Sequence, residues 1–72
     1  MSSFKEADFV AIPSDLALAA GVTPMGTIVW HVPEAPFATV ECQVVADNPN
    51  GWVTELVDVP LERLTLIEAW TA

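Results

Sequence analysis

Prolines and glycines recur along this chain at intervals too short for long helices. Proline fixes the backbone and removes a hydrogen-bond donor, and glycine favours turns, so each of these residues tends to end a helix or interrupt a strand. They lie at Pro13, Gly21, Pro24, Gly26, Pro33, Pro36, Pro49, Gly51 and Pro60. The spacing predicts short strands joined by turns, and therefore an all-β fold.

Three strands are expected in the first two thirds of the chain. The first covers residues 9–12 and ends at Pro13, and the second covers residues 27–32 after a tight turn at 23–26. The third is the clearest, because apolar and polar residues alternate from position 38 to position 46. We expect Val40, Cys42 and Val44 to be buried and Glu41 and Gln43 to face outward.

A hairpin is predicted by the turn residues 47–51, which include the Asn-Gly pair at 50 and 51. The returning strand covers residues 52–59, one helical turn follows at 61–64, and a last strand passes through Leu66 and Ile67. A brief helical turn is also expected from Ser14, as its N-cap, to Gly21, as its C-terminal stop.

These elements predict a small five-stranded SH3-like barrel with one or two short helical turns, a closed form that would remove exposed sheet edges. A chain of 72 residues has room for one core, so residues 1–72 form a single domain, with residues 1–7 expected to be a flexible tail. Three segments set the order of motifs: Gly26-Thr27-Ile28-Val29, then Val40-Glu41-Cys42, then Leu56-Val57 followed by Leu64.

This order resembles a family of small bacterial SH3-like barrels known as domain of unknown function 4926. The resemblance covers about residues 8–67, which is nearly the whole chain. It implies the fold, and it brings no catalytic residues that could be placed on positions of this sequence.

Charge restricts the partners of the chain. Lys5 and Arg63 are the only basic side chains against ten acidic ones, which gives a formal net charge of -8. Phosphate backbones would be repelled, so no nucleic-acid partner is expected, whereas a basic protein would be attracted. Plain solubility explains the same charge equally well.

Cysteine usage and hydropathy indicate the compartment. Cys42 is the only cysteine, so no internal disulfide and no multi-thiolate metal site is available, and a reducing cytoplasm fits best. The N-terminal residues lack the apolar stretch of a signal peptide, and no segment has the length of a membrane span. We expect Cys42 to be a small buried hydrophobic residue whose thiol takes part in no redox or nucleophilic reaction.

Catalytic chemistry is not favoured by the residues present. His31 is the only histidine, with Glu34 and Glu41 as the nearest candidate carboxylates, and a packed or surface histidine explains it better than acid–base work. The oxygen donors Asp47, Asn48 and Asn50 are explained by turn chemistry rather than calcium binding. We therefore expect no enzyme activity, no cofactor and no metal site.

Three tryptophans are difficult to bury in one small domain. Trp30 and Trp52 could fill the core, and Trp70 could hold the C-terminal tail against the domain. We nevertheless expect at least one indole to be exposed as an interface anchor. The residues predicted to bind a partner are Trp30, Trp52, Trp70 and His31.

The predicted function is a non-enzymatic, acidic protein-interaction domain that binds or neutralises a basic protein partner or pairs with itself as a homodimer. The alternative is an accessory barrel of an enzyme, or a small-ligand-binding domain, with His31 and nearby carboxylates at its site.

Overall fold

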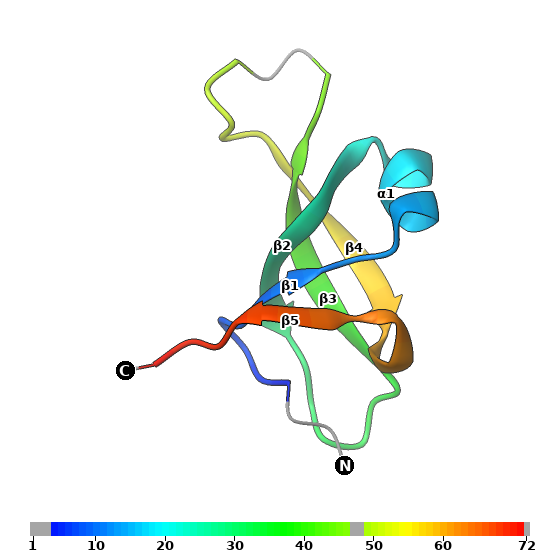
Figure 1. The fold of residues 1–72 in the computed structure, drawn as a ribbon, viewed down its shortest axis with the longest axis vertical. Coiled ribbons are helices and arrows are strands. Elements are labelled where there is room, and N and C mark those ends of the chain that lie inside the picture. Colours follow the sequence, from blue (N-terminus) through cyan, green and yellow to red (C-terminus); the bar gives the residue numbers. More distant parts are fainter. Residues whose placement is uncertain (1–3, 47–48, 72) are drawn as a thin grey trace.

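The described residues form five antiparallel strands, one short helix and one 3₁₀ turn (Figure 1). The computed structural model describes residues 4–46 and 49–71. In chain order the elements are β1 (Phe9–Ala11), α1 (Ser14–Ala20), β2 (Val22–Trp30), β3 (Phe37–Val44), β4 (Thr54–Pro60), η1 (Leu61–Arg63) and β5 (Thr65–Glu68). The predicted all-β class and its five strands are confirmed.

The strands form one sheet in the order β4-β3-β2-β1-β5. The long strand β2 pairs with β3 along one edge and with β1 along the other, so it belongs to both halves of the sheet. In Figure 1, β1 and β5 cross the direction of β3 and β4. Over the described residues the hydrogen-bond ladder does not join β4 to β5, which therefore lie at its two edges.

The core lies on the inward face of these strands and consists of small and branched side chains. Its members are Val10, Ile12, Ala17, Val22, Ile28, Ala38, Val40, Cys42, Val59 and Leu64. The expected register of β3 is confirmed, because Val40 and Cys42 are buried while Glu41 and Gln43 are exposed. Val44 is only partly buried and packs against the edge of the core.

Helix α1 begins at Ser14, the residue that was expected to be its N-cap. Pro13 occupies the N-cap position without a side-chain hydrogen bond, so the prediction of Ser14 as N-cap is wrong. The predicted stop at Gly21 is confirmed, because this glycine adopts φ 72° and its N–H caps the carbonyls of Ala17 and Leu18. The 3₁₀ turn η1 and the last strand lie where the sequence predicts them.

The predicted tight turn at residues 23–26 is wrong, because these residues belong to β2. Proline is tolerated here: the carbonyl of Pro24 accepts a hydrogen bond from the N–H of Ile12, and the β2–β3 pairing shifts register between Val22 and Gly26. Gly26 is required by close approach, since a Cβ there would overlap the main-chain oxygen of Glu41. The turn signals therefore mark an irregular strand.

The predicted hairpin connects β3 to β4, which are paired from Phe37–Pro60 to Gln43–Thr54. Residues 47 and 48 of its turn, Asp47 and Asn48, lie outside the described residues. Next to them, the side-chain amide of Gln43 donates a hydrogen bond of 2.8 Å to the carbonyl of Gly51, which adopts φ 69°.

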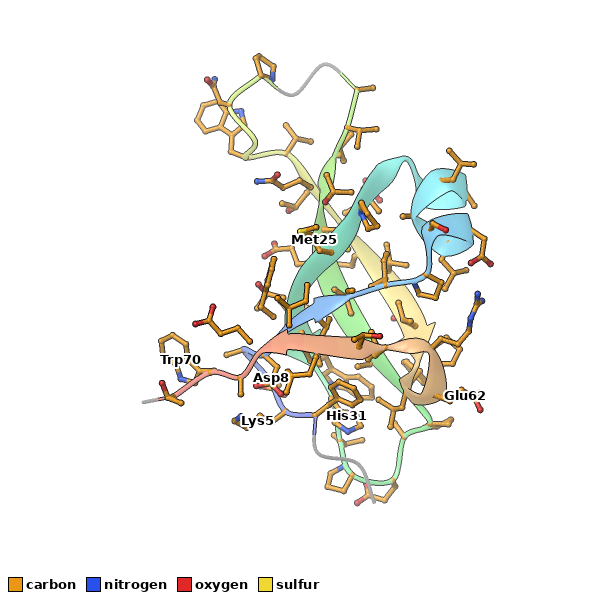
Figure 2. All side chains as sticks on the ribbon, viewed as in Figure 1. Lys5, Asp8, Met25, His31, Glu62 and Trp70 are labelled. Atoms are coloured by element: carbon orange, nitrogen blue, oxygen red, sulfur yellow. The ribbon has the colours of Figure 1, made fainter. Side chains whose placement is uncertain are left out.

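Asp8, the residue before β1, links the N-terminal and C-terminal segments through hydrogen bonds. Its buried carboxylate accepts hydrogen bonds from the Lys5 ammonium at 2.9 Å, the Lys5 N–H at 3.0 Å and the Trp70 N–H at 3.0 Å. Figure 2 shows Lys5, Asp8 and Trp70 on the same side of the molecule. Phe4 packs on the core, and the N–H of Ala7 donates a hydrogen bond to the carbonyl of Ile28. Residues 4–7 of the expected tail are therefore attached to the domain.

Candidate functional site

None of the three tryptophans belongs to the core. Their exposed fractions are 42% for Trp30, 77% for Trp52 and 58% for Trp70. The expectation that at least one indole is exposed is confirmed, and the alternative that Trp30 and Trp52 fill the core is wrong. An exposed indole offers a large apolar area beside a polar edge, which suits an interface.

The tryptophans lie at separate places in the fold. Trp30 ends β2, where its ring stacks on Phe37 at a centroid distance of 5.5 Å. Trp52 lies near the opposite end of β3, beside Val53, whose carbonyl accepts the N–H of Val44. Trp70 follows β5 and is held through its main chain by Asp8. The four residues predicted to bind a partner therefore do not form one patch.

His31 lies beside Trp30 and has a local structural contact. Its Nδ1–H donates to the main-chain oxygen of Phe37 at 3.3 Å, which ties the end of β2 to the start of β3. Glu41, one of the carboxylates considered for acid–base work, instead accepts a hydrogen bond of 3.1 Å from the Thr54 hydroxyl. The structure thus brings His31 together with the Trp30–Phe37 ring pair and places Glu41 in a different site.

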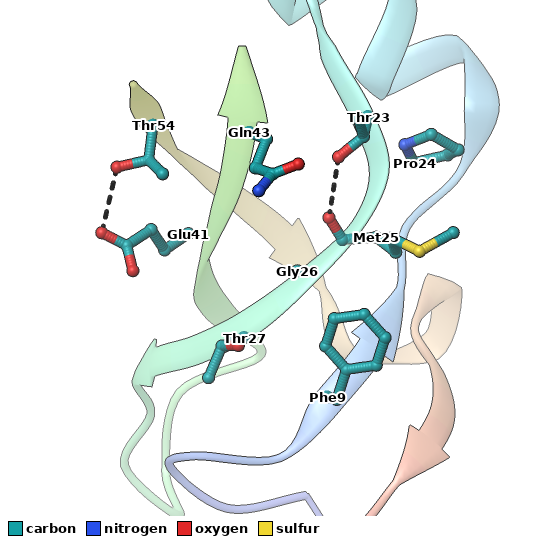
Figure 3. A pocket seen from close by; sticks show the side chains of 9 residues that line it. All are labelled: Phe9, Thr23, Pro24, Met25, Gly26, Thr27, Glu41, Gln43 and Thr54. Carbon is teal, nitrogen blue, oxygen red and sulfur yellow. Dashed lines mark hydrogen bonds between the residues drawn. The ribbon is translucent and has the colours of Figure 1, made fainter. Parts of the chain in front are cut away.

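A groove of about 440 Å³ lies on the outward face of the sheet (Figure 3). It spans β1, β2, β3 and the start of β4, and its lining residues are Phe9, Thr23, Pro24, Met25, Gly26, Thr27, Glu41, Gln43 and Thr54. Strand pairing explains the arrangement, because Phe9 pairs with Thr27, and Thr27 pairs with Glu41. Partners in an antiparallel ladder present their side chains to the same face.

The groove has an apolar wall and a polar wall. Figure 3 shows Phe9 and Met25 on one side, with Glu41 and Thr54 on the other. The hydroxyl of Thr23 is turned back onto the carbonyl of Met25 at 3.2 Å, which fixes the bend of β2 beside the apolar wall. The site therefore combines hydrophobic contact area with one carboxylate and several hydrogen-bonding side chains.

This groove was not predicted from the sequence. The alternation of β3 correctly placed Glu41 and Gln43 outward, but Phe9 and Met25 come from segments that were interpreted as a short strand and a turn. Only the pairing of four strands brings these residues together. The one usable signal was the set of polar residues on the outward face of β3.

Both basic side chains are already engaged within the molecule. Lys5 pairs with Asp8, and Arg63 pairs with Asp15 through two hydrogen bonds of 2.7 and 3.3 Å. The Arg63 guanidinium outweighs partial desolvation and holds the pKa of Asp15 below its ordinary value. The remaining carboxylates of the chain have no lysine or arginine side chain left to neutralise them.

Fold and site together define a small all-β domain with an acidic surface, exposed indoles and a groove on the outer face of its sheet. No family model, no curated protein and no solved structure matches the chain. Within residues 4–46 and 49–71, no cluster of histidine, cysteine and carboxylate side chains has the makeup of a metal site. In the same residues, α1 is far shorter than a helix that could cross a membrane.

Proposed function

We propose that this chain is a non-enzymatic interaction domain that binds a basic protein partner. The internal pairing of Lys5 and Arg63 is the observation that carries this proposal. Because these two cations already pair with Asp8 and Asp15, the other eight of the ten acidic side chains have no lysine or arginine of this chain to neutralise them, and their charge can act on an external partner. Complementary charge of this kind accelerates association and disfavours acidic competitors.

Apolar surface supplies the second part of the proposal. Charge alone gives fast but weak and unspecific association, and specific interfaces usually contain aromatic or aliphatic anchors. The chain exposes Trp30, Trp52 and Trp70, and the groove adds Phe9 and Met25. A basic partner with apolar residues among its charges would match both properties.

A small-ligand-binding domain is the second candidate, and the groove is the observation that favours it. Its volume of about 440 Å³ falls within the range of small-molecule sites, roughly 300 to 1,000 Å³. The groove is nevertheless an open feature of a sheet face, lined by threonine, glutamine and glutamate as well as by apolar side chains. A ligand-binding domain would bind its ligand without a protein partner.

Affinity capture from a lysate of the native host, followed by binding to the purified captured protein, tests the proposal. We expect the immobilised domain to retain a basic protein at low ionic strength and to release it as salt rises, because screening weakens attraction between opposite charges. A Trp52→Ala variant, which removes the most exposed indole, measures whether that indole contributes to the contact.

Two results would contradict this proposal. If the purified chain sediments as a homodimer that persists or strengthens with salt, its exposed surface serves self-association, because screening relieves repulsion between like-charged subunits. If the retained protein is acidic, or if its retention does not respond to salt, charge complementarity is not the basis of binding.

A further inference from the structure

We propose that the groove on the outer face of the sheet receives one lysine or arginine side chain of the basic partner. Glu41 is the counter-ion for its charge, and Phe9 and Met25 contact its alkyl stem. This inference rests on the proposed function and names the place and the residue type through which the partner is recognised.

The geometry of the groove fits a long side chain that ends in a cation. Glu41 and Thr54 lie on one side of the groove, and Phe9 and Met25 lie on the other (Figure 3). A lysine or arginine side chain is apolar along its stem and charged at its tip, so its two parts require two different walls. Short polar side chains would leave the apolar wall uncovered, and aliphatic ones would leave the charge of Glu41 without a counter-ion.

The carboxylate of Glu41 is positioned to accept hydrogen bonds from a ligand. The Thr54 hydroxyl donates to Oε2 of Glu41 at 3.1 Å, and this contact holds the carboxylate at the side of the groove. An ionised carboxylate has about four acceptor positions, so one hydrogen bond leaves capacity for an ammonium or guanidinium group. Charge-assisted hydrogen bonds of this type are about twice as strong as neutral ones.

Charge complementarity selects the occupant. No lysine, arginine or histidine lines the groove, and both basic side chains of the chain are paired at other sites. The apolar wall is exposed enough to gain from coverage, because 43% of Met25 is accessible to solvent. A cation with a hydrocarbon stem therefore satisfies the carboxylate and covers the apolar wall at once.

A short capped peptide, acetyl-Ala-Ala-Lys-Ala-Ala-amide, is the probe for this site. Titrated into isotopically labelled full-length protein at low salt, it should shift the amide resonances of Phe9, Met25, Thr27 and Glu41 before those of other residues. Replacing its lysine by norleucine keeps most of the stem and removes the charge. Replacing it by diaminobutyric acid keeps the charge and shortens the stem, and both replacements should weaken binding.

A pair of variants separates the groove from the general field of the protein. Glu41→Gln removes the counter-ion, and the amide oxygen of the new side chain can still accept the hydrogen bond from the Thr54 hydroxyl. Glu55→Gln removes the same charge from the opposite face, because Glu55 is the pairing partner of inward-facing Cys42. We expect Glu41→Gln to weaken binding of the lysine peptide by about three- to tenfold. Glu55→Gln should weaken it by less than about twofold.

Met25→Ser tests the apolar wall without touching a charge. Since Met25 is a surface residue, circular dichroism should show an unchanged fold. The variant should weaken binding of the lysine peptide more than binding of the diaminobutyric acid peptide. Resonance shifts centred on another surface would overturn the proposal. Equal binding of the norleucine and lysine peptides would do the same.

The two levels of the proposal fail in different ways. Equal losses of affinity for the lysine peptide in Glu41→Gln and Glu55→Gln would show that the peptide responds to overall charge. That result would overturn the groove as the binding place but would leave the proposal of a basic partner intact. If neither the peptide nor any basic protein from the host binds the unmodified domain, the proposed function itself is overturned.

Discussion

Gly26 is the point at which β2 comes closest to β3. A methyl group there would overlap the main-chain oxygen of Glu41 and would lie 2.9 Å from the sulfur of Cys42. We expect Gly26→Ala to lower the free energy of unfolding by about 1–3 kcal/mol, the usual cost of overpacking a closely packed site. Urea-induced unfolding followed by tryptophan fluorescence measures this loss.

The origin of the strain can be tested by adding Cys42→Ala to Gly26→Ala. The sulfur is a side-chain atom and would be removed, whereas the oxygen of Glu41 belongs to the backbone and would remain. We expect the double variant to be at least as unstable as Gly26→Ala alone. Recovery of stability in the double variant would show that the sulfur, and not the backbone, sets the limit.

At the scale of elements, β3 was predictable because it follows a simple periodicity. One face is buried and one is exposed, so the alternation from Ala38 to Gln43 fixes the register without knowledge of the other strands. Strand β2 was not predictable over residues 23–26, because Pro24 and Gly26 have the composition of a turn. Only pairing with β1 and β3 makes an extended conformation favourable there.

The candidate site was less predictable than the fold for the same reason. A periodic pattern tells which residues of one strand share a face, but it does not tell which strands are neighbours. Phe9 and Glu41 lie on opposite sides of Thr27 only because β2 pairs with both β1 and β3. The positions of the exposed tryptophans, at strand ends and in connections, also follow from topology and not from local sequence.

The inward face of β3 provides a test of its own through Cys42. Burial, and secondarily the charge of Glu41, raise the pKa of this thiol, so its reactive thiolate form is disfavoured at neutral pH. We expect a thiol reagent to modify the native protein far more slowly than the urea-unfolded protein. Cys42→Ala should lower stability by about 1–2 kcal/mol, because it leaves a small cavity beside Val40.

The opposite outcome for Cys42 would be informative. Labelling at the same rate in native and unfolded protein would contradict the burial of the thiol and, with it, the register of β3. Glu41 and Gln43 would then not be fixed on the outward face.

At the scale of the whole molecule, the dimensions explain why the indoles lie outside. The shortest extent is 17 Å, and the core contains valine, isoleucine, leucine, alanine and cysteine but no aromatic side chain. One layer of aliphatic side chains fills such an interior, and a small domain buries a limited share of its surface. Composition indicated this shortage of interior volume, although it did not determine which tryptophans would be exposed.

Asp8 makes the stability of the whole domain sensitive to acid. Burial alone would raise the pKa of Asp8, but hydrogen bonds from the Lys5 ammonium and from the N–H groups of Trp70 and Lys5 outweigh it, so the pKa lies below the ordinary value of 3.8. A lowered pKa in the folded state contributes stability above pH 3.8, and that contribution is lost as the pH falls through the folded-state value.

Asp8→Asn isolates this effect from the other carboxylates. We expect the variant to lower the free energy of unfolding by about 1–3 kcal/mol at pH 7, since charged hydrogen bonds to Lys5 and Trp70 are lost or weakened. The difference from the unmodified protein should shrink as the pH falls below 4. Unfolding curves recorded from pH 3 to 7 measure it, and a difference that stays constant with pH would exclude this role.

Within the described residues, β4 pairs with β3 alone and leaves its other edge open, which affects how the protein behaves at high concentration. An open edge is a template on which a second copy can add a strand, and chains of such additions lead to aggregates. Strand β4 carries Glu55 and Asp58, so alignment with the same edge of another copy would bring like charges close together. The negative charge to which we assign the attraction of a basic partner would thus also disfavour strand addition between two copies of this chain.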